Sequence, residues 1–195
     1  MTSNRTAPVL VRPLAGLRVR TPQPDDVPAL LDFLTDGLQG YRSFAPPGWV
    51  PPVQNTAAKV QRTLAELAGA RTHSRMAVDG SEVVGFVHLC GPDSPVDVRL
   101  RYLFVAEPWW GTGLAPELHD GAVAALGDRR ARLFTPDAHA RARRFYERRG
   151  WRRHGDPQGS PLGLPVVEYR RTGGAQAQPT AVRASRVRAV RFRAG

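Results

Sequence analysis

Two glycines, Gly111 and Gly113, stand one residue apart in EPWWGTGLAPELHDGAVAAL, between an apolar run and a segment with the pattern of a helix. The first N–H groups of a helix have no partners inside it and lie at the positive end of its dipole. Glycine also lets the backbone approach an anion closely and adopt a positive φ. The turn is therefore predicted to cradle phosphate oxygens, and an ordinary strand-to-helix turn is the alternative.

This predicted cradle relies on backbone N–H groups rather than on charged side chains. It has no Gly-Lys-Ser/Thr of a Walker loop, and it lacks the third glycine of the dinucleotide fingerprint. Its residues are Trp110, Gly111, Thr112, Gly113, Leu114 and Ala115.

A second segment that could carry chemistry, HARARRFYERRGW, spans residues 139–151. It follows the strand expected at 131–135, and it places Tyr146 near the end of an expected helix that Gly150 terminates. Its arginines could pair with phosphates, although a solvated arginine face explains them equally well; they are Arg141, Arg143 and Arg144.

In order and spacing, the two segments resemble the motifs of the GNAT acyl-CoA-dependent N-acetyltransferases. Val105 and the cradle match the first motif, Val-x-x-x-x-Gln/Arg-x-x-Gly-x-Gly/Ala, except that Trp110 stands where Gln or Arg is usual. The second motif, Asn-x-x-Ala-x-x-Phe-Tyr-Glu-x-x-Gly-Phe, is matched with His139 in the position of Asn. The remaining matches are Ala142, Phe145, Tyr146, Glu147, Gly150 and Trp151, and the resemblance covers about residues 17–171.

The resemblance implies acetyl-CoA as co-substrate and no metal. It implies that Tyr146 faces the CoA sulfur and protonates the leaving thiolate, whereas spacing alone would favour a core tyrosine. It further implies that His139 contacts the pantetheine arm. A bulged strand would pair with that arm and supply an oxyanion N–H near Phe104 or Val105; its residues are Leu103, Phe104 and Val105.

The general base is not assigned by the sequence. Asp97, His88 and Glu168 are candidates, each with a solvated or structural role as the alternative, and a chain of water molecules could also remove the proton. In folds of this family the acceptor pocket is lined by the segment between the first two helices and by the late strands, which here means residues 43–52 and the loop 156–165. The residues expected there are Phe44, Trp49, His88 and Glu168.

Hydrophobic periodicity predicts the elements that position these residues. The expected strands are 17–21, a hairpin over 73–90, 98–106, 131–135, 151–155 and 165–171. The expected helices begin near Pro24, at 114 and at 139, and another is expected to run to about Ala68 with Asn55 as its N-cap; the segment 40–53 is expected to be irregular. The fold class is therefore mixed α/β. The resemblance implies a GNAT fold: a mixed, mostly antiparallel sheet of six to seven strands with about four helices, splayed between the fourth and fifth strands.

One domain is expected at 15–171, between a flexible arm at 1–14 and a basic, disordered tail at 172–195. The formal net charge is +11, and five arginines of the tail contribute to it. No run approaches the ~20 apolar residues that cross a bilayer. The single cysteine, Cys90, and the absence of a signal peptide favour a cytoplasmic protein.

The expected function is transfer of acetyl from acetyl-CoA to a primary amine of a small molecule, an amino-acid derivative or a peptide. One alternative is a catalytically silent acyl-CoA-binding protein. The other is a basic nucleic-acid-binding protein, which the sequence disfavours because it carries no recognised nucleic-acid-binding motif. A homodimer is compatible with the family, and no segment predicts a membrane partner.

Overall fold

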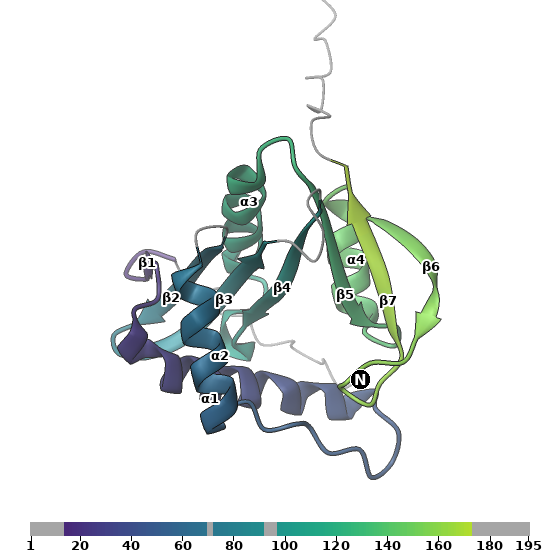
Figure 1. Cartoon of the computed structure of the whole chain (residues 1–195), viewed down its shortest axis with the longest axis horizontal. Coiled ribbons are helices and arrows are strands. Elements are labelled where there is room, and N and C mark those ends of the chain that lie inside the picture. Colours follow the sequence, from purple (N-terminus) through teal and green to yellow (C-terminus); the bar gives the residue numbers. More distant parts are fainter. Residues whose placement is uncertain (1–13, 70–71, 92–96, 173–195) are drawn as a thin grey trace, which may run out of the picture.

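A computed structural model describes residues 14–69, 72–91 and 97–172. They form a seven-stranded sheet in the order β1-β2-β3-β4-β5-β7-β6 (Figure 1). The strands are β1 (Arg18–Arg20), β2 (His73–Asp79), β3 (Glu82–Cys90), β4 (Asp97–Val105), β5 (Arg130–Pro136), β6 (Arg152–Gln158) and β7 (Val166–Arg171). The expected mixed sheet is confirmed. Nearly all of the predicted arm and tail lies outside the described residues.

Four α-helices and three short 3-10 helices accompany the sheet in the described residues. The α-helices are α1 (Val27–Gln39), α2 (Ala57–Ala68), α3 (Leu114–Leu126) and α4 (Ala140–Arg148). The 3-10 helices are η1 (Pro24–Asp26), η2 (Gly40–Ser43) and η3 (Glu107–Trp109). None of the described helices is long and apolar enough to cross a bilayer.

The helices pack on both faces of the sheet and bury two apolar clusters. α1 contributes Leu30 and Leu34 to a cluster with Met76 and Phe86 on one face. α3 contributes Leu114 and Leu118 to a larger cluster on the other face, which also holds Leu133, Tyr146, Trp151 and Tyr169. In Figure 1, α2 lies in front of the sheet and α4 lies behind β5 and β7. This alternation of apolar residues between faces is the pattern that the strand periodicity predicts.

The expected splay between β4 and β5 is confirmed. These two strands are parallel and pair only between Asp97–Leu100 and Arg130–Leu133. Beyond Leu100 the strands separate, so that the sheet opens into a wedge that Figure 1 shows between them. The remaining strand pairs are antiparallel. One edge of β4 therefore lies open along the wedge while the other pairs with β3.

Two local expectations are wrong. Asn55 does not cap α2; Thr56 does, since its side-chain oxygen accepts a hydrogen bond from the backbone N–H of Lys59 at 3.4 Å. Asn55 instead donates to Asp32 on α1 at 2.8 Å. The segment 40–53 is not wholly irregular, because η2 occupies its first residues before the prolines prevent continuation.

Candidate functional site

The cradle adopts the backbone that its glycines predict. Gly111 has φ +81° and Gly113 has φ +98°, a region that residues with a side chain rarely adopt. Among the described residues, no group accepts a hydrogen bond from the backbone N–H of Gly111, Thr112, Gly113 or Ala115. These donors lie together at the start of α3, which makes the turn suitable for an anion.

Trp110, which replaces the usual Gln or Arg, is held at the entrance of the cradle. Its indole Nε1 donates to the carbonyl oxygen of Val105 at 2.8 Å. Arg141 of α4 lies over the indole ring, with Cζ 3.9 Å from the ring centroid. The residue remains 47 % exposed. Trp110 therefore ties the cradle to the end of β4 and brings a guanidinium beside it.

The bulge in β4 lies earlier than the expected position near Phe104 or Val105. His88 pairs with Tyr102 and Leu89 with Leu100, which leaves Arg101 as the extra residue. Phe104 and Val105 pair regularly with Phe86 and Gly85. The bulge turns Arg101 toward α2, where its guanidinium pairs with the carboxylate of Glu66. Leu103, Phe104 and Val105 still lie where β4 has separated from β5.

Tyr146 lies in the larger apolar cluster, with 8 % of its surface exposed. Its ring packs edge-on against Trp151, at 6.0 Å between centroids. Burial raises the pKa of its hydroxyl, and the nearby Tyr41 raises it further. The hydroxyl consequently keeps its proton at neutral pH, as a proton donor must.

His139 joins an aromatic cluster that the sequence does not reveal. Its ring stacks on Phe44 at 5.0 Å and tilts against Tyr41 at 5.2 Å, and Tyr41 stacks on Phe104 of β4 at 6.2 Å. Burial, helped by the charge of Arg141, lowers the pKa of His139 to about 4. Its Nδ1 is buried without a partner among the described residues. A neutral imidazole with an unsatisfied nitrogen suits an amide such as those of pantetheine.

Tyr41 is the residue of this cluster that sequence reasoning missed. It is the second residue of η2, in the segment expected to be irregular, and only its aromatic type could have drawn attention to it. Its ring contacts those of Phe44 and Trp49, with centroid distances of 5.2 and 6.5 Å. Tyr41 therefore connects two predicted acceptor residues to the wedge.

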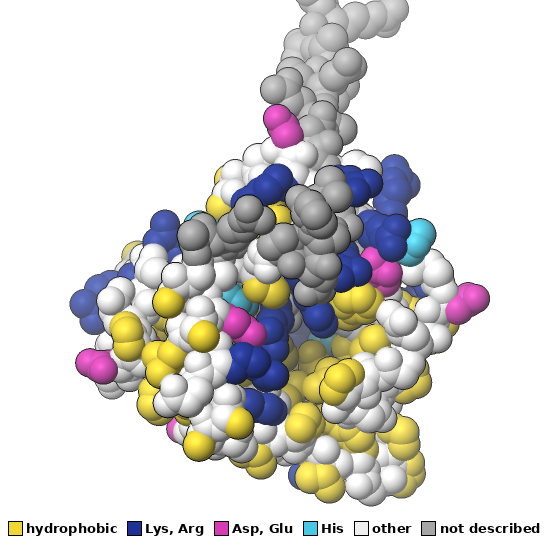
Figure 2. Space-filling model, in the orientation of Figure 1, with side chains coloured by type: hydrophobic (Ala, Val, Ile, Leu, Met, Phe, Trp, Pro, Cys, Tyr) yellow, Lys and Arg dark blue, Asp and Glu magenta, His cyan; other side chains and the backbone are white. Residues whose placement is uncertain are grey.

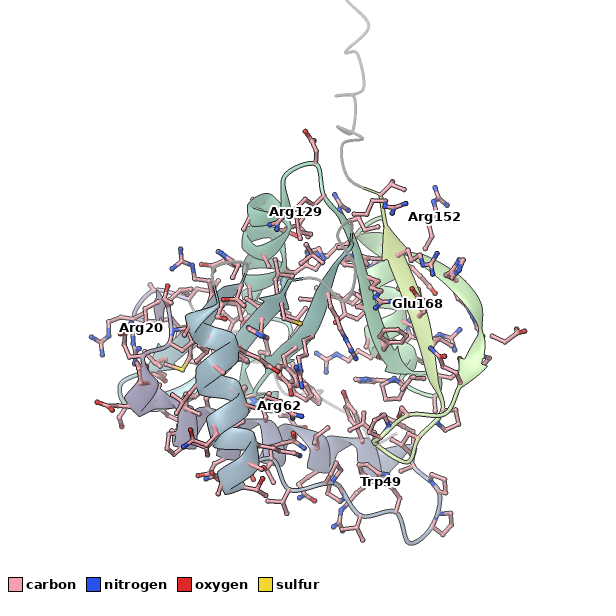
Figure 3. All side chains as sticks on the ribbon, viewed as in Figure 1. Arg20, Trp49, Arg62, Arg129, Arg152 and Glu168 are labelled. Carbon is pink, nitrogen blue, oxygen red and sulfur yellow. The ribbon has the colours of Figure 1, made fainter. Side chains whose placement is uncertain are left out.

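Trp49 joins the two loops that were expected to line the acceptor pocket. Its Nε1 donates to the carbonyl oxygen of Leu162 at 2.7 Å. Figure 3 shows Trp49 on the loop below β5 and β7, whereas Glu168 lies higher, on β7 itself. Phe44 and Trp49 thus share one cluster, and Glu168 is not part of it.

The candidate bases lie apart from Tyr146. His88 is 2 % exposed beneath α2, and its Nδ1 is hydrogen-bonded to Ser74 Oγ at 2.7 Å. Burial and the charge of Arg101 lower the pKa of His88 to about 4, which makes it a weak base at neutral pH. Glu168 accepts a hydrogen bond from Arg170 at 2.7 Å. The side chain of Asp97 lies outside the described part, and no described group of His, Cys, Asp and Glu could hold a metal ion.

The three phosphate-pairing candidates of α4 have different surroundings. Arg141 lies beside the cradle because its guanidinium group contacts the ring of Trp110. Arg143 donates to the backbone oxygen and carboxylate of Asp137, at 2.8 and 3.0 Å. Arg144 is exposed. Arg141 is therefore the one of the three that the structure brings to the cradle.

Comparisons with known proteins agree with this arrangement. Residues 52–172 match the family model described as an acetyltransferase (GNAT) domain. No curated protein matches.

Several solved structures share the fold. The PaiA N-acetyltransferase of Thermoplasma acidophilum in complex with coenzyme A has a TM-score of 0.60 and 14 % identity, covering 80 % of this chain and 99 % of that chain. A GNAT acetyltransferase of Staphylococcus aureus Mu50 has a TM-score of 0.63 and 16 % identity, covering 80 % and 98 %. The ribosomal-protein-S18-alanine N-acetyltransferase of Escherichia coli has a TM-score of 0.59 and 15 % identity, covering 83 % and 97 %.

Proposed function

Because the chain belongs to the GNAT acetyltransferase family, we propose that it transfers an acetyl group from acetyl-CoA to a primary amine of a small molecule, an amino-acid derivative or a peptide. One observation carries this proposal: the cradle, most of whose N–H groups have no acceptor among the described residues, follows the strand that borders the wedge after the single turn of η3. If the cradle held the pyrophosphate of acetyl-CoA, the acetyl end of the same molecule would lie beside β4.

The residues present fit acetyl-CoA. The cradle would hold its pyrophosphate, with Arg141 beside it as a cation. The open edge of β4 at Leu103, Phe104 and Val105 would pair with the pantetheine arm in the manner of an added strand. The buried Nδ1 of His139 would bond an amide of the same arm.

Acetyl-CoA supplies an activated thioester. During transfer, the amine nitrogen bonds to the acyl carbon, the carbon–sulfur bond breaks, the amine loses a proton and the sulfur gains one. Tyr146 would donate that last proton, because its buried hydroxyl stays protonated. A backbone N–H on the open edge of β4 would stabilise the charge that develops on the acyl oxygen.

The chain uses no dedicated base in this proposal. His88 is engaged by Ser74 under α2, and Glu168 is paired with Arg170. The amine would therefore lose its proton to water before attack. A consequence is that activity rises with pH until the acceptor amine itself is deprotonated.

Calorimetric titration of the full chain with acetyl-CoA tests the proposal, with ATP as a control that carries phosphates but no pantetheine. One-to-one binding of acetyl-CoA, much tighter than that of ATP, is expected. Release of free thiol is then measured over a panel of primary amines. Absence of acetyl-CoA binding contradicts the proposal.

A silent acyl-CoA-binding protein is the second candidate, since Trp110 and His139 depart from the family motifs. Binding of acetyl-CoA without thiol release for any amine would favour it. The third expectation, nucleic-acid binding, relied largely on the arginines of the tail, which lie outside the described residues. We further propose a cytoplasmic location, in keeping with a single cysteine.

A further inference from the structure

Three basic side chains gather around one carboxylate between α2 and β4. Lys59 and Arg62 belong to α2, and Arg101 belongs to β4. The carboxylate is that of Glu66, whose Oε1 accepts a hydrogen bond from Arg101 and lies 3.8 Å from Nε of Arg62. We call Lys59, Arg62 and Arg101 the cationic cluster.

The charges of the cationic cluster lie close enough to affect one another. Burial lowers the pKa of Lys59, and the positive charges of Arg62 and Arg101 lower it further. Lys59 donates to the uncharged carbonyl oxygen of Val53 at 2.7 Å. Among the described residues, Glu66 is the acid that pairs with the cluster, so positive charge exceeds negative charge there.

Stabilisation of α2 explains only part of this arrangement. The pair between Arg62 and Glu66 has the spacing that supports a helix. Lys59 and Arg62, however, are like charges one turn apart, which is unfavourable in a helix. Arg101 contributes nothing to helix formation, because it reaches Glu66 from another element.

The bulge in β4 is what carries Arg101 into the cluster. Leu100 and Leu103 both pack in the larger apolar cluster on the opposite face, and regular alternation would not place them on the same side. The extra residue restores that match and leaves Arg101 beside Tyr102, with Cζ 5.4 Å from the ring centroid. Bulges often redirect a side chain next to an active site.

The cationic cluster borders the wedge where transfer is proposed. Leu100 and Leu133 form the last pair of β4 with β5, so Arg101 is the first residue of the open edge. Figure 3 shows Arg62 on the side of α2 toward the wedge. Figure 2 shows basic side chains beside the central hollow, with apolar side chains next to them.

We propose that the cationic cluster binds the carboxylate of the acceptor, which is then an amino acid or a short peptide rather than a simple amine. This inference rests on the proposed function, whose acceptor it narrows. Guanidinium groups pair with carboxylates in a planar, bidentate geometry. Glu66 already presents such a group to two members of the cluster. An acceptor held there would direct its amine along the open edge of β4.

The phosphates of acetyl-CoA do not account for the cluster. The cradle, which is proposed to hold them, lies beyond the far end of the open edge, after Val105. Arg101 and Val105 are separated by about 13 Å along an extended strand. The cluster is therefore placed beside the acetyl end of the molecule, where an acceptor would enter.

The test uses the full chain and N-acetyl derivatives of alanine, leucine, phenylalanine and glutamine, and of their dipeptides with glycine. These are products of the proposed transfer, and their blocked amines do not titrate. Each acid is compared with its carboxamide, which keeps the size and lacks the negative charge. Binding is measured by saturation-transfer NMR without acetyl-CoA, and acetylation of the parent amines is measured by thiol release.

Three variants assess the cluster. Lys59→Gln/Arg62→Gln removes its two cations on α2, and Arg18→Gln/Arg148→Gln removes two exposed arginines elsewhere as a control. Glu66→Gln removes the carboxylate that competes with the acceptor. If Glu66→Gln fails to fold, the first variant decides alone.

At least one acid is expected to bind about tenfold more tightly than its carboxamide, and less so as salt rises. Lys59→Gln/Arg62→Gln should remove about fivefold of this preference, and the control variant should keep it. Glu66→Gln should increase the preference, which a purely structural role for the cluster does not predict. In the transfer assay, KM for acidic acceptors should follow these changes while KM for acetyl-CoA stays constant.

Equal affinity for acid and carboxamide across the panel overturns the proposal, as does an equal loss in the control variant. A preference that survives Lys59→Gln/Arg62→Gln assigns the carboxylate to other groups and also overturns it. Selective binding of acids without acetylation of their parent amines overturns the acceptor role. Failure of acetyl-CoA to bind contradicts the proposed function alone, because the acids are measured without it.

Discussion

The indole Nε1 of Trp110 donates a hydrogen bond to the carbonyl oxygen of Val105 at 2.8 Å, across the turn that joins β4 to α3. The residue that departs from the family motif is thus the one that fastens the cradle to the strand. A second contact, from Arg141 to the same ring, fastens the turn to α4. The cradle is therefore held from both sides of the wedge.

Trp110→Phe should weaken acetyl-CoA binding about fivefold. Phenylalanine keeps an aromatic surface for Arg141 but removes the bond to Val105, and a hydrogen bond of this kind contributes ~1 kcal/mol. Calorimetric titration measures the change, with Trp49→Phe as a second tryptophan that donates to a backbone oxygen away from the cradle. An unchanged dissociation constant for Trp110→Phe would show that the bond does not organise the cradle.

Gly113→Ala should lower both acetyl-CoA affinity, by more than tenfold, and stability, by ~1 kcal/mol. An added Cβ meets no close neighbour, but φ +98° is unfavourable for alanine, so the turn must change shape. Gly121→Ala is the matched control, because Gly121 lies exposed inside α3 with open space around it. Alanine there should raise stability slightly and leave binding unaltered. Equal effects of the two substitutions would argue against a special role for the turn.

Tyr146→Phe should lower kcat about 100-fold while the dissociation constant for acetyl-CoA stays constant. The substitution keeps the ring in the core and removes the hydroxyl that would protonate the leaving thiolate. Tyr169→Phe is the comparison, since Tyr169 is buried in the same cluster but donates its hydroxyl to Glu147 at 2.7 Å. Tyr169→Phe should cost stability and not kcat. If the Tyr146→Phe variant kept full turnover, the leaving thiolate would have to receive its proton from another donor.

The elements were predictable because their patterns are local. The periodicity of 114–126 and the turn at Asp79-Gly80 lie within single segments, and the structure agrees with both. The glycine motif likewise predicted its positive φ values. The splay followed from the family resemblance rather than from periodicity.

Features that depend on register or on distant packing were not predictable. The bulge falls at Arg101 because one residue is skipped between the pairs His88–Tyr102 and Leu89–Leu100, which no local pattern specifies. The cross-strand pairing of Arg132 with Arg99 and with Arg170 requires knowing which residues of neighbouring strands lie opposite one another. The stacking of His139 on Phe44 joins residues that are far apart in the sequence.

Acidification should destabilise the protein through His88. Its pKa is about 4 in the folded chain, against an unfolded value near 6.5, so between these pH values the unfolded chain binds a proton that the folded chain does not. The free energy of unfolding therefore falls as pH drops from about 6.5 toward 4, by up to ~3 kcal/mol from this group. Urea unfolding at pH 7.5 and pH 5 measures the fall. The variant Ser74→Ala/His88→Leu removes both partners of the buried hydrogen bond and should show a smaller fall between the two pH values. An identical fall in wild type and variant would place the acid sensitivity in other groups, of which His139, with a pKa also near 4, is the next to replace.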